Sequence, residues 1–340
     1  MPVLRNASHV FAAALQITLS VFLLLGVLDT ALPAQTDVND VHVVPRRSPI
    51  ALSDALVSSV GGLHLIKSDV NLVLVPVSVT DPLERLVTGL NQENFQLFEG
   101  KKPQEIRHFS SEDVPISVGI ILDASGSMGN KMDRVREAVS QFCDAANPRD
   151  EFFMVMFSDE PRVATDFTFS PEDLERDLLF TKPKGRTALL DAIYLGLHMM
   201  DNATYAKKAL LIISDGGDNH SRYTEKEIKT AARESDVMVY AVGTFDRYAP
   251  TQEEMLGPGL LSQIASSTGG RSFVVENAVA LPEITRRIGA ELRTQYVLGY
   301  RPQDVAPDGK WHKIQVKLRL PKKFSFLRAH ARSGYYAASR

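Results

Sequence analysis

The segment from Val118 to Leu122 is the feature that most restricts how this chain can fold. It is an uninterrupted apolar run, Val-Gly-Ile-Ile-Leu, followed at once by the polar Asp123. A half-exposed strand alternates polar and apolar residues, whereas a continuous apolar run is typical of a strand buried on both faces. The sequence therefore predicts a parallel sheet that is covered by helices on each side.

Apolar residues after this strand follow helical and extended patterns in turn. Those between Val135 and Ala146 recur at helical spacing, and Phe152–Phe157 is again extended. Further helices are predicted at 189–200, 225–234, 260–267 and 282–293, and further strands at 209–213, 237–242 and 271–275. Strands that alternate with helices indicate an α/β fold, and we predict a doubly wound, mostly parallel sheet with helices on both faces.

Two β segments flank the predicted α/β part. Val70–Thr80 is rich in valine and leucine, and Pro76 within it indicates an edge strand or a bulge. Phe95–Phe98 leads into a tight turn, and Ile106–Phe109 is the predicted return strand. Ile314–Leu320 alternates apolar and polar residues. Neither segment has enough strands to be stable alone, so we predict that the two pair in one small β-sandwich.

The N-terminal residues have the pattern of an export signal. Arg5 provides a positive charge, Val10–Leu28 is uncharged and mostly apolar, and the small residue Ala34 follows. We interpret this as a secretory signal cleaved after Ala34. The alternative is an uncleaved membrane anchor, because the apolar stretch approaches spanning length. In either case we expect the rest of the chain to be exported, to a periplasm, a cell surface or the medium.

These patterns divide the chain into five parts. They are a signal peptide (1–34), a linker (35–62), an N-terminal β segment (63–112), an α/β domain (113–298) and a C-terminal β segment (299–340) that pairs with 63–112.

Composition excludes some classes of function. The net charge is −3 and the pI about 6.3, and there is no basic stripe of the kind that nucleic-acid binders carry. The single cysteine, Cys143, excludes an intrachain disulfide. Cys143 lies in a helical pattern, so we expect a small core residue rather than a reactive thiol.

Polar side chains follow the ends of the predicted strands. Asp123, Ser125 and Ser127 follow the first strand, Thr187 precedes a helix, and Asp215 ends another apolar run. Open α/β sheets place their sites at the carboxyl ends of strands. Two carboxylates and three hydroxyls can surround one hard divalent cation, Mg²⁺ first, with Mn²⁺ or Ca²⁺ as alternatives. The competing interpretation is that these residues only cap helices.

Three further polar residues stay outside this predicted ligand set. Asp218 and Asn219 are assigned turn and capping roles. Asp191 lies inside the helix after Thr187, and the sequence leaves open whether it supports the site or faces solvent.

Asp123-x-Ser125-x-Ser127, the later Thr187 and Ser214-Asp215-Gly216 together resemble the metal-ion-dependent adhesion site of von Willebrand factor type A domains. The likeness covers about Ile116 to Leu298. The flanking segments, which include Thr88-Gly89-Leu90 and Leu298-Gly299-Tyr300, resemble an exported bacterial subfamily of such domains.

The resemblance implies a binding module. Ser125, Ser127 and Thr187 would hold the cation directly, and Asp123 and Asp215 directly or through water. An Asp or Glu carboxylate of a partner protein would then take the open position. We therefore expect adhesion or complex assembly. The alternative is a scaffold subunit of an envelope complex, in which the ion only ties loops together.

An enzyme is not expected. The chain contains no Gly-x-Ser-x-Gly elbow, no His-Glu-x-x-His pair and no Gly-x-x-x-x-Gly-Lys phosphate loop. The remaining expectations on partners are no nucleic acid, and contact with a membrane only through an uncleaved signal segment.

Overall fold

The computed structural model describes residues 72–215, 217–244, 252–302 and 309–337, which all belong to one compact unit, Lys67–Arg340. The predicted signal peptide, its cleavage site and the predicted linker lie outside the described residues. None of the helices among the described residues combines the length and the apolar character that crossing a membrane requires.

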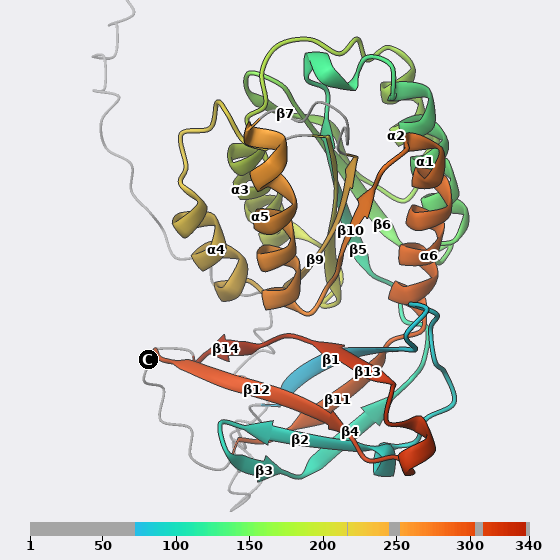
Figure 1. Cartoon of the computed structure of the whole chain (residues 1–340), viewed down its shortest axis with the longest axis vertical. Helices are drawn as coiled ribbons and strands as arrows, with labels where there is room; N and C mark the ends of the chain where they lie inside the picture. Colours follow the sequence, from blue (N-terminus) through green and yellow to red (C-terminus); the bar gives the residue numbers. More distant parts are fainter. Residues whose placement is uncertain (1–71, 216, 245–251, 303–308, 338–340) are drawn as a thin grey trace, which may run out of the picture. The chain divides into compact units, whose positions relative to one another are not determined.

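A six-stranded sheet of order β10-β9-β8-β5-β6-β7 forms the centre of the α/β part (Figure 1). Its strands are β5 Ser117–Asp123, β6 Glu151–Phe157, β7 Pro161–Thr168, β8 Lys208–Ser214, β9 Val237–Thr244 and β10 Ser272–Val275. All neighbours pair in parallel except β7, which runs antiparallel to β6. This confirms the predicted mostly parallel sheet.

Helices cover both faces of this sheet, as Figure 1 shows. One face carries α1 Met132–Asp144, α2 Pro171–Leu179 and α6 Leu281–Arg293, and the other carries α3 Leu189–Met199, α4 Glu225–Glu234 and α5 Gln252–Thr268. Along β5, Ile120 and Leu122 pack towards the first layer and Ile121 towards the second. Every residue of β5 is buried, which explains why its sequence is continuously apolar.

Two elements of the α/β part are absent from the sequence-based prediction, β7 and α2. β7 is an edge strand with mostly exposed or half-buried residues, and its pairing with β6 is irregular. Such a strand lacks the apolar run that marks its neighbours. The sequence of α2 did carry a signal, because Ser170 and Pro171 precede two acidic residues, as at a helix N-terminus. Leu174 and Leu178, which the helix buries, are four positions apart.

Two four-stranded antiparallel sheets, β13-β1-β11-β4 and β14-β12-β2-β3, make up the rest of the described chain. Their strands are β1 Val73–Thr80, β2 Phe95–Glu99, β3 Lys102–Gln104, β4 Ile106–Ser110, β11 Tyr296–Tyr300, β12 Trp311–Leu318, β13 Arg328–Ala331 and β14 Gly334–Tyr336. The two sheets share one apolar core, to which Val77, Phe95, Leu298 and Ile314 all contribute. The small β-sandwich built from the flanking segments, part of the predicted fold class, is thereby confirmed.

The pairing within the sandwich corrects one prediction. Ile106–Phe109 was expected to return alongside Phe95–Phe98, but the hairpin partner of β2 is β3. β4 instead pairs with β11 in the opposite sheet. The chain therefore crosses from one sheet to the other at Glu105, which a local alternation pattern does not reveal.

Pro76 also lies in a different setting from the predicted edge strand. β1 lies between β11 and β13 and is an interior strand. β13, however, pairs only with Val77–Thr80. At Pro76 only β11 is a neighbour, so the missing N–H of proline costs no ladder hydrogen bond on the open side.

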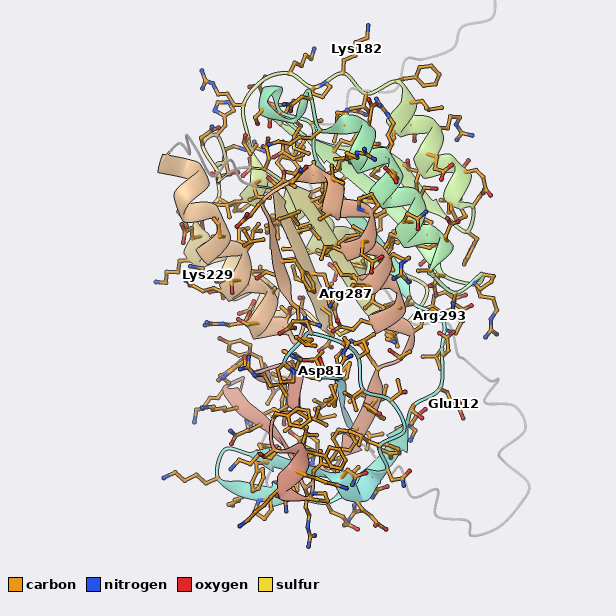
Figure 2. The ribbon with its side chains drawn as sticks, turned by 45° about the vertical axis from the view of Figure 1, so that its right-hand side comes forward. Asp81, Glu112, Lys182, Lys229, Arg287 and Arg293 are labelled. Carbon is orange, nitrogen blue, oxygen red and sulfur yellow. The ribbon has the colours of Figure 1, made fainter. Side chains whose placement is uncertain are left out.

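A buried polar network joins the sandwich to the α/β part. Arg271 pairs with Glu291 at 2.8 Å and also with Glu84, and the Tyr240 hydroxyl donates to Glu291 at 2.9 Å. Arg287, labelled in Figure 2, donates to the backbone oxygen of Glu84 at 2.6 Å. Buried charges persist only when they are paired and hydrogen-bonded, so these contacts fix how the two layers meet.

The first prediction concerns Cys143 on α1, which packs against the core. Burial, with the carboxylates of Glu175 and Asp144 nearby, raises the pKa of its thiol to about 12. Because the thiolate is the reactive form, Ellman's reagent at pH 8 should label the folded protein about a thousandfold more slowly than the unfolded protein. Equal rates with and without denaturant would show that the thiol is open to solvent.

The second prediction concerns the shared sandwich core. Removing residues 310–340 deletes β12, the partner of β2, together with β13 and β14. Phe95 and Leu97 should then lose their cover, and limited proteolysis should cut first within residues 72–110. A control that lacks only residues 338–340 should resist the protease as the full chain does. Unchanged protection of residues 72–110 in the longer truncation would contradict a shared core.

Candidate metal centre

Four of the five predicted ligands meet at the carboxyl ends of β5 and β8. Asp123 accepts hydrogen bonds from the Ser125 N–H at 2.9 Å and from the Ser214 hydroxyl at 2.5 Å. The hydroxyls of Ser125 and Ser127 lie 3.1 Å apart, and Ser127 donates to Asp215 Oδ1 at 2.8 Å. The parallel register of β5 and β8 produces this meeting, because it brings the ends of the two strands side by side.

The hydroxyls of this loop do not act as helix caps. Ser125 is the N-cap of the short 3-10 helix Gly126–Met128, but its side chain makes no capping hydrogen bond. Lys131 occupies the N-cap of α1, again without a side-chain cap. Ser125 and Ser127 turn towards each other and towards Asp215 instead, so the interpretation as caps alone does not fit.

The loop that carries Thr187 lies against the loop after β5. The Gly126 N–H donates to Gly185 O at 3.1 Å, and the Lys184 N–H donates to Ala124 O at 2.9 Å. Thr187 is buried. Within the described ranges, however, no hydrogen bond joins its hydroxyl to the other four predicted ligands. Backbone hydrogen bonds of the Thr187 loop, and not the Thr187 hydroxyl, therefore hold this residue beside the cluster.

Glycine is required at position 185 in this loop. Its φ is +82°, a conformation that side chains disfavour. A Cβ there would also lie 2.5 Å from Asp159 Oδ2. The same carboxylate accepts the Arg186 N–H at 3.0 Å, so Asp159 holds the loop in place just before Thr187.

The loop after β8 is tied to the Thr187 loop by residues that the sequence assigned to turns and caps. Asn219 Oδ1 accepts the Thr187 N–H at 2.9 Å, and the Asn219 N–H donates to Thr187 O at 3.0 Å. Asp218 accepts the Leu190 N–H in the first turn of α3 at 3.1 Å. The buried Asp191 accepts the N–H groups of Arg222 and Tyr223. These three residues position loops rather than complete the ligand cluster.

The charges in the cluster do not balance. Asp123 and Asp215 are both 0% exposed. Lys131 Nζ lies 2.5 Å from Asp215 Oδ2, whereas the hydrogen-bond donors to Asp123 are the neutral Ser125 N–H and Ser214 hydroxyl. Burial raises the pKa of Asp123 to about 6, against the lowering effect of these hydrogen bonds and with a contribution from the charge of Asp215. At neutral pH the buried charge of Asp123 therefore has no ion-pair partner among the described residues.

The donor set fits a hard divalent cation. All of its atoms are oxygens, the preferred ligands of Mg²⁺, Mn²⁺ and Ca²⁺. No cluster of three or more His, Cys, Asp or Glu side chains is found in the part of the chain that the structure describes, so an ion here would need the hydroxyls too. The buried Thr244 hydroxyl has no hydrogen-bond partner among the described residues, and the Thr244 backbone oxygen lies 3.5 Å from Lys131 Nζ. Lys131 thus contacts both Asp215 and the backbone oxygen of Thr244.

Sequence reasoning missed Thr244 and Lys131 at this centre, and it included Ser214 only within the Ser214-Asp215-Gly216 motif. Thr244 stands at the end of β9 and carries no distinctive pattern. Lys131 did carry a signal. A lysine at a helix N-terminus is disfavoured by the helix dipole, so its position before α1 indicates a nearby carboxylate.

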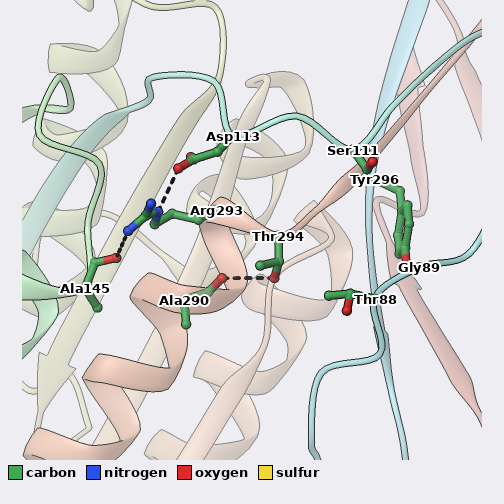
Figure 3. A pocket seen from close by; sticks show the side chains of 9 residues that line it. All are labelled: Thr88, Gly89, Ser111, Asp113, Ala145, Ala290, Arg293, Thr294 and Tyr296. Atoms are coloured by element: carbon green, nitrogen blue, oxygen red, sulfur yellow. Dashed lines mark hydrogen bonds and ion pairs between the residues drawn. The ribbon is translucent and has the colours of Figure 1, made fainter.

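A cavity elsewhere in the structure is a weaker candidate. A cavity of about 530 Å³ lies among α6, the end of α1 and the sandwich, lined by Arg293, Asp113 and Tyr296 among others (Figure 3). Arg293 Nε pairs with Asp113 at 2.8 Å, so these two charges cancel. The cavity therefore lacks the charge imbalance that distinguishes the strand-end cluster.

The third prediction is that Asp123→Asn stabilises the metal-free protein. A carboxyl whose folded-state pKa is raised from 3.8 to about 6 costs stability as the pH rises through that interval. At pH 8 with chelator, the variant should gain up to about 3 kcal/mol and a higher Tm, measured by scanning calorimetry. Asn retains an oxygen for the Ser125 N–H, so a lower Tm would mean that hydrogen bonds alone satisfy the charged carboxylate.

Comparisons with known proteins find a family model that matches part of this chain. Residues 118–217 match the model of the von Willebrand factor type A domain. The chain is 25% identical over 149 residues to inter-alpha-trypsin inhibitor heavy chain H4 of Homo sapiens, a match that covers 38% of this chain and 16% of that protein.

Solved structures of similar proteins include a von Willebrand factor type A protein from Catenulispora acidiphila, with 14% identity, 80% of this chain and 75% of that chain covered, and a TM-score of 0.47. The conserved hypothetical protein BatB from Bacteroides thetaiotaomicron is 21% identical, with 52% of this chain and 98% of that chain covered, and a TM-score of 0.42. The segment that the family model matches runs from β5 to the residues just after β8 and includes all five predicted ligands. Over residues 118–217 this chain therefore matches the von Willebrand factor type A domain family.

Proposed function

We propose that this domain is a divalent-cation-dependent protein-binding module that acts in adhesion or complex assembly. The observation that carries the proposal is the charge imbalance at the strand ends, where Asp123 and Asp215 are both fully buried and Lys131 pairs with Asp215. Burying an uncompensated charge costs free energy of folding. A bound cation would neutralise this charge and recover that free energy.

In this proposal Asp123, Ser125, Ser127, Thr187 and Asp215 hold the cation, with Mg²⁺ as the first candidate. The bound ion would supply positive charge that attracts an Asp or Glu carboxylate of a partner protein. Ser125 and Ser127 are neutral, so they orient the ion without cancelling its charge. Asn219 and Asp159 keep the Thr187 loop at the correct place.

The exposure pattern favours an open binding site over a structural ion. Asp123 and Ser125 are buried, whereas Ser127 and its neighbours Gly126 and Gly129 are exposed. The cluster is therefore closed towards the sheet and open towards solvent at Ser127. A scaffold subunit with a purely structural ion would instead enclose it on all sides.

Binding rather than catalysis is part of the proposal. Hydrolysis at a metal centre calls for a general base close to the ion. The ring of His220, in the loop after β8, contacts Arg186 Nη1 at 3.1 Å, on an exposed surface. We also propose an extracytoplasmic location, and the pattern of residues 1–34 supports it.

The fourth prediction tests metal dependence. Asp123→Ala removes a buried anionic ligand and should abolish Mg²⁺ or Mn²⁺ binding in calorimetric titrations. Thr187→Ala removes one neutral hydroxyl and should weaken partner capture more than cation affinity. Thr294→Ala, which removes an exposed hydroxyl at the end of α6, is the matched control and should change neither.

Partner capture is measured with the immobilised protein and envelope extracts, in Mg²⁺ against chelator. The proposal fails if wild-type capture is equal in both, or if Asp123→Ala binds cations as the wild type does. Neither variant should unfold the sheet, because the altered side chains belong to loops at the strand ends.

A further inference from the structure

We propose that Lys131 is a built-in counterion, which competes with the divalent cation for Asp215 and thereby sets the affinity of the site. The inference rests on the proposed function, because it concerns the same cation. It assigns to Lys131 a positioning role in the charge balance rather than a role as a ligand.

The first support is the environment of the ammonium group. Lys131 Nζ lies 2.5 Å from Asp215 Oδ2 and 3.5 Å from the backbone oxygen of Thr244. These oxygens come from the ends of β8 and β9, so the ammonium occupies a position that is built to hold positive charge. The side chain of Lys131 is 20% exposed and that of Asp215 is 0% exposed, so solvent screens the pair only weakly.

The second support is the place of Lys131 in its helix. It is the N-cap of α1, where unpaired N–H groups and the helix dipole disfavour a cation. The Lys131 side chain makes no capping hydrogen bond there. Its pairing with Asp215 offsets this cost, which explains why an otherwise unfavourable residue stands at the N-cap.

Competition follows from the positive charge that already lies beside Asp215. Ser127 donates to Oδ1 and Lys131 donates to Oδ2, so both carboxylate oxygens already have a donor. Each oxygen keeps a free lone pair, so a divalent cation can still bind there, but it must do so beside the ammonium, which repels it. The lysine stem is flexible and partly exposed, so the ammonium can withdraw to solvent when a cation enters.

The decisive experiment is a calorimetric titration of Lys131→Met with Mn²⁺. Without the competing charge, the variant should bind Mn²⁺ about tenfold more tightly or better than the wild type. Lys182→Met is the matched control. Lys182 is exposed on the loop that leads to Thr187 (Figure 2), so its loss should change the affinity less than about twofold because solvent and salt screen it. Unchanged or weaker binding by Lys131→Met would overturn the competition.

A second measurement needs no cation. In chelator, Lys131→Met should lower the Tm of the wild type, because Asp215 is left buried and unpaired. In the background of Asp215→Asn the same substitution should have little effect, because no charge remains to be balanced. Equal losses of Tm in both backgrounds would overturn the counterion. If Lys131→Met does not fold, Lys131→Gln replaces it in both experiments.

The two measurements separate the two proposals. If neither the wild type nor any variant binds Mn²⁺, the proposed function fails, and so does the competition. The thermal measurement then decides by itself whether Lys131 balances the charge of Asp215. If the wild type binds Mn²⁺ and Lys131→Met binds it equally well, the proposed function stands and the competition is wrong.

Discussion

The burial of β5 (Ser117–Asp123) on both faces forces the polar groups of this domain out to the ends of its strands. Side chains of β5 pack alternately into the two helical layers, and no position along the strand is left for solvent. Because β5 pairs in parallel with both β6 and β8, the carboxyl ends of these strands share one edge. Asp123 and Asp215 meet there as a consequence of packing elsewhere. The middle of each strand thus stabilises the sheet, and the carboxyl end of the same strand carries the polar groups of the site.

The buried carboxylates at that edge of the sheet lower the stability of the fold. Asp123 and Asp215 are fully buried, and among the described residues Lys131 forms an ion pair with Asp215 but not with Asp123. Hydrogen bonds from Ser125 and Ser214 soften the cost at Asp123 but do not remove it, as its raised pKa shows. Local arrangements that cost stability are concentrated at functional sites. Backbone hydrogen bonds hold the neighbouring loops together. The unfavourable free energy at this edge therefore comes from the buried charge and not from the conformation of the loops.

The sandwich completes the unit at the other end of β5. β4 ends at Ser110 just before β5 begins, and β11 starts at Tyr296 just after α6 ends. Segments before and after the α/β part therefore enter the same two sheets and bury one apolar core. Arg271 and Glu291 lock this layer to the α/β part through a buried ion pair. The sandwich joins the amino end of β5, so it leaves the strand-end cluster at the carboxyl edge accessible.

The sequence by itself determined the fold class and the positions of the candidate ligands, because each rests on a local pattern. The apolar run of β5 reports burial on both faces, and polar residues such as Asp123 directly after it mark a strand end. Only the tertiary structure decided which distant groups meet. β4 joined the opposite sheet, the exposed edge strand β7 showed no apolar run, and Lys131 found its carboxylate 84 residues away. A local pattern records how deeply a residue is buried. It does not record which remote partner satisfies its charge, because that depends on the register and packing of the whole sheet.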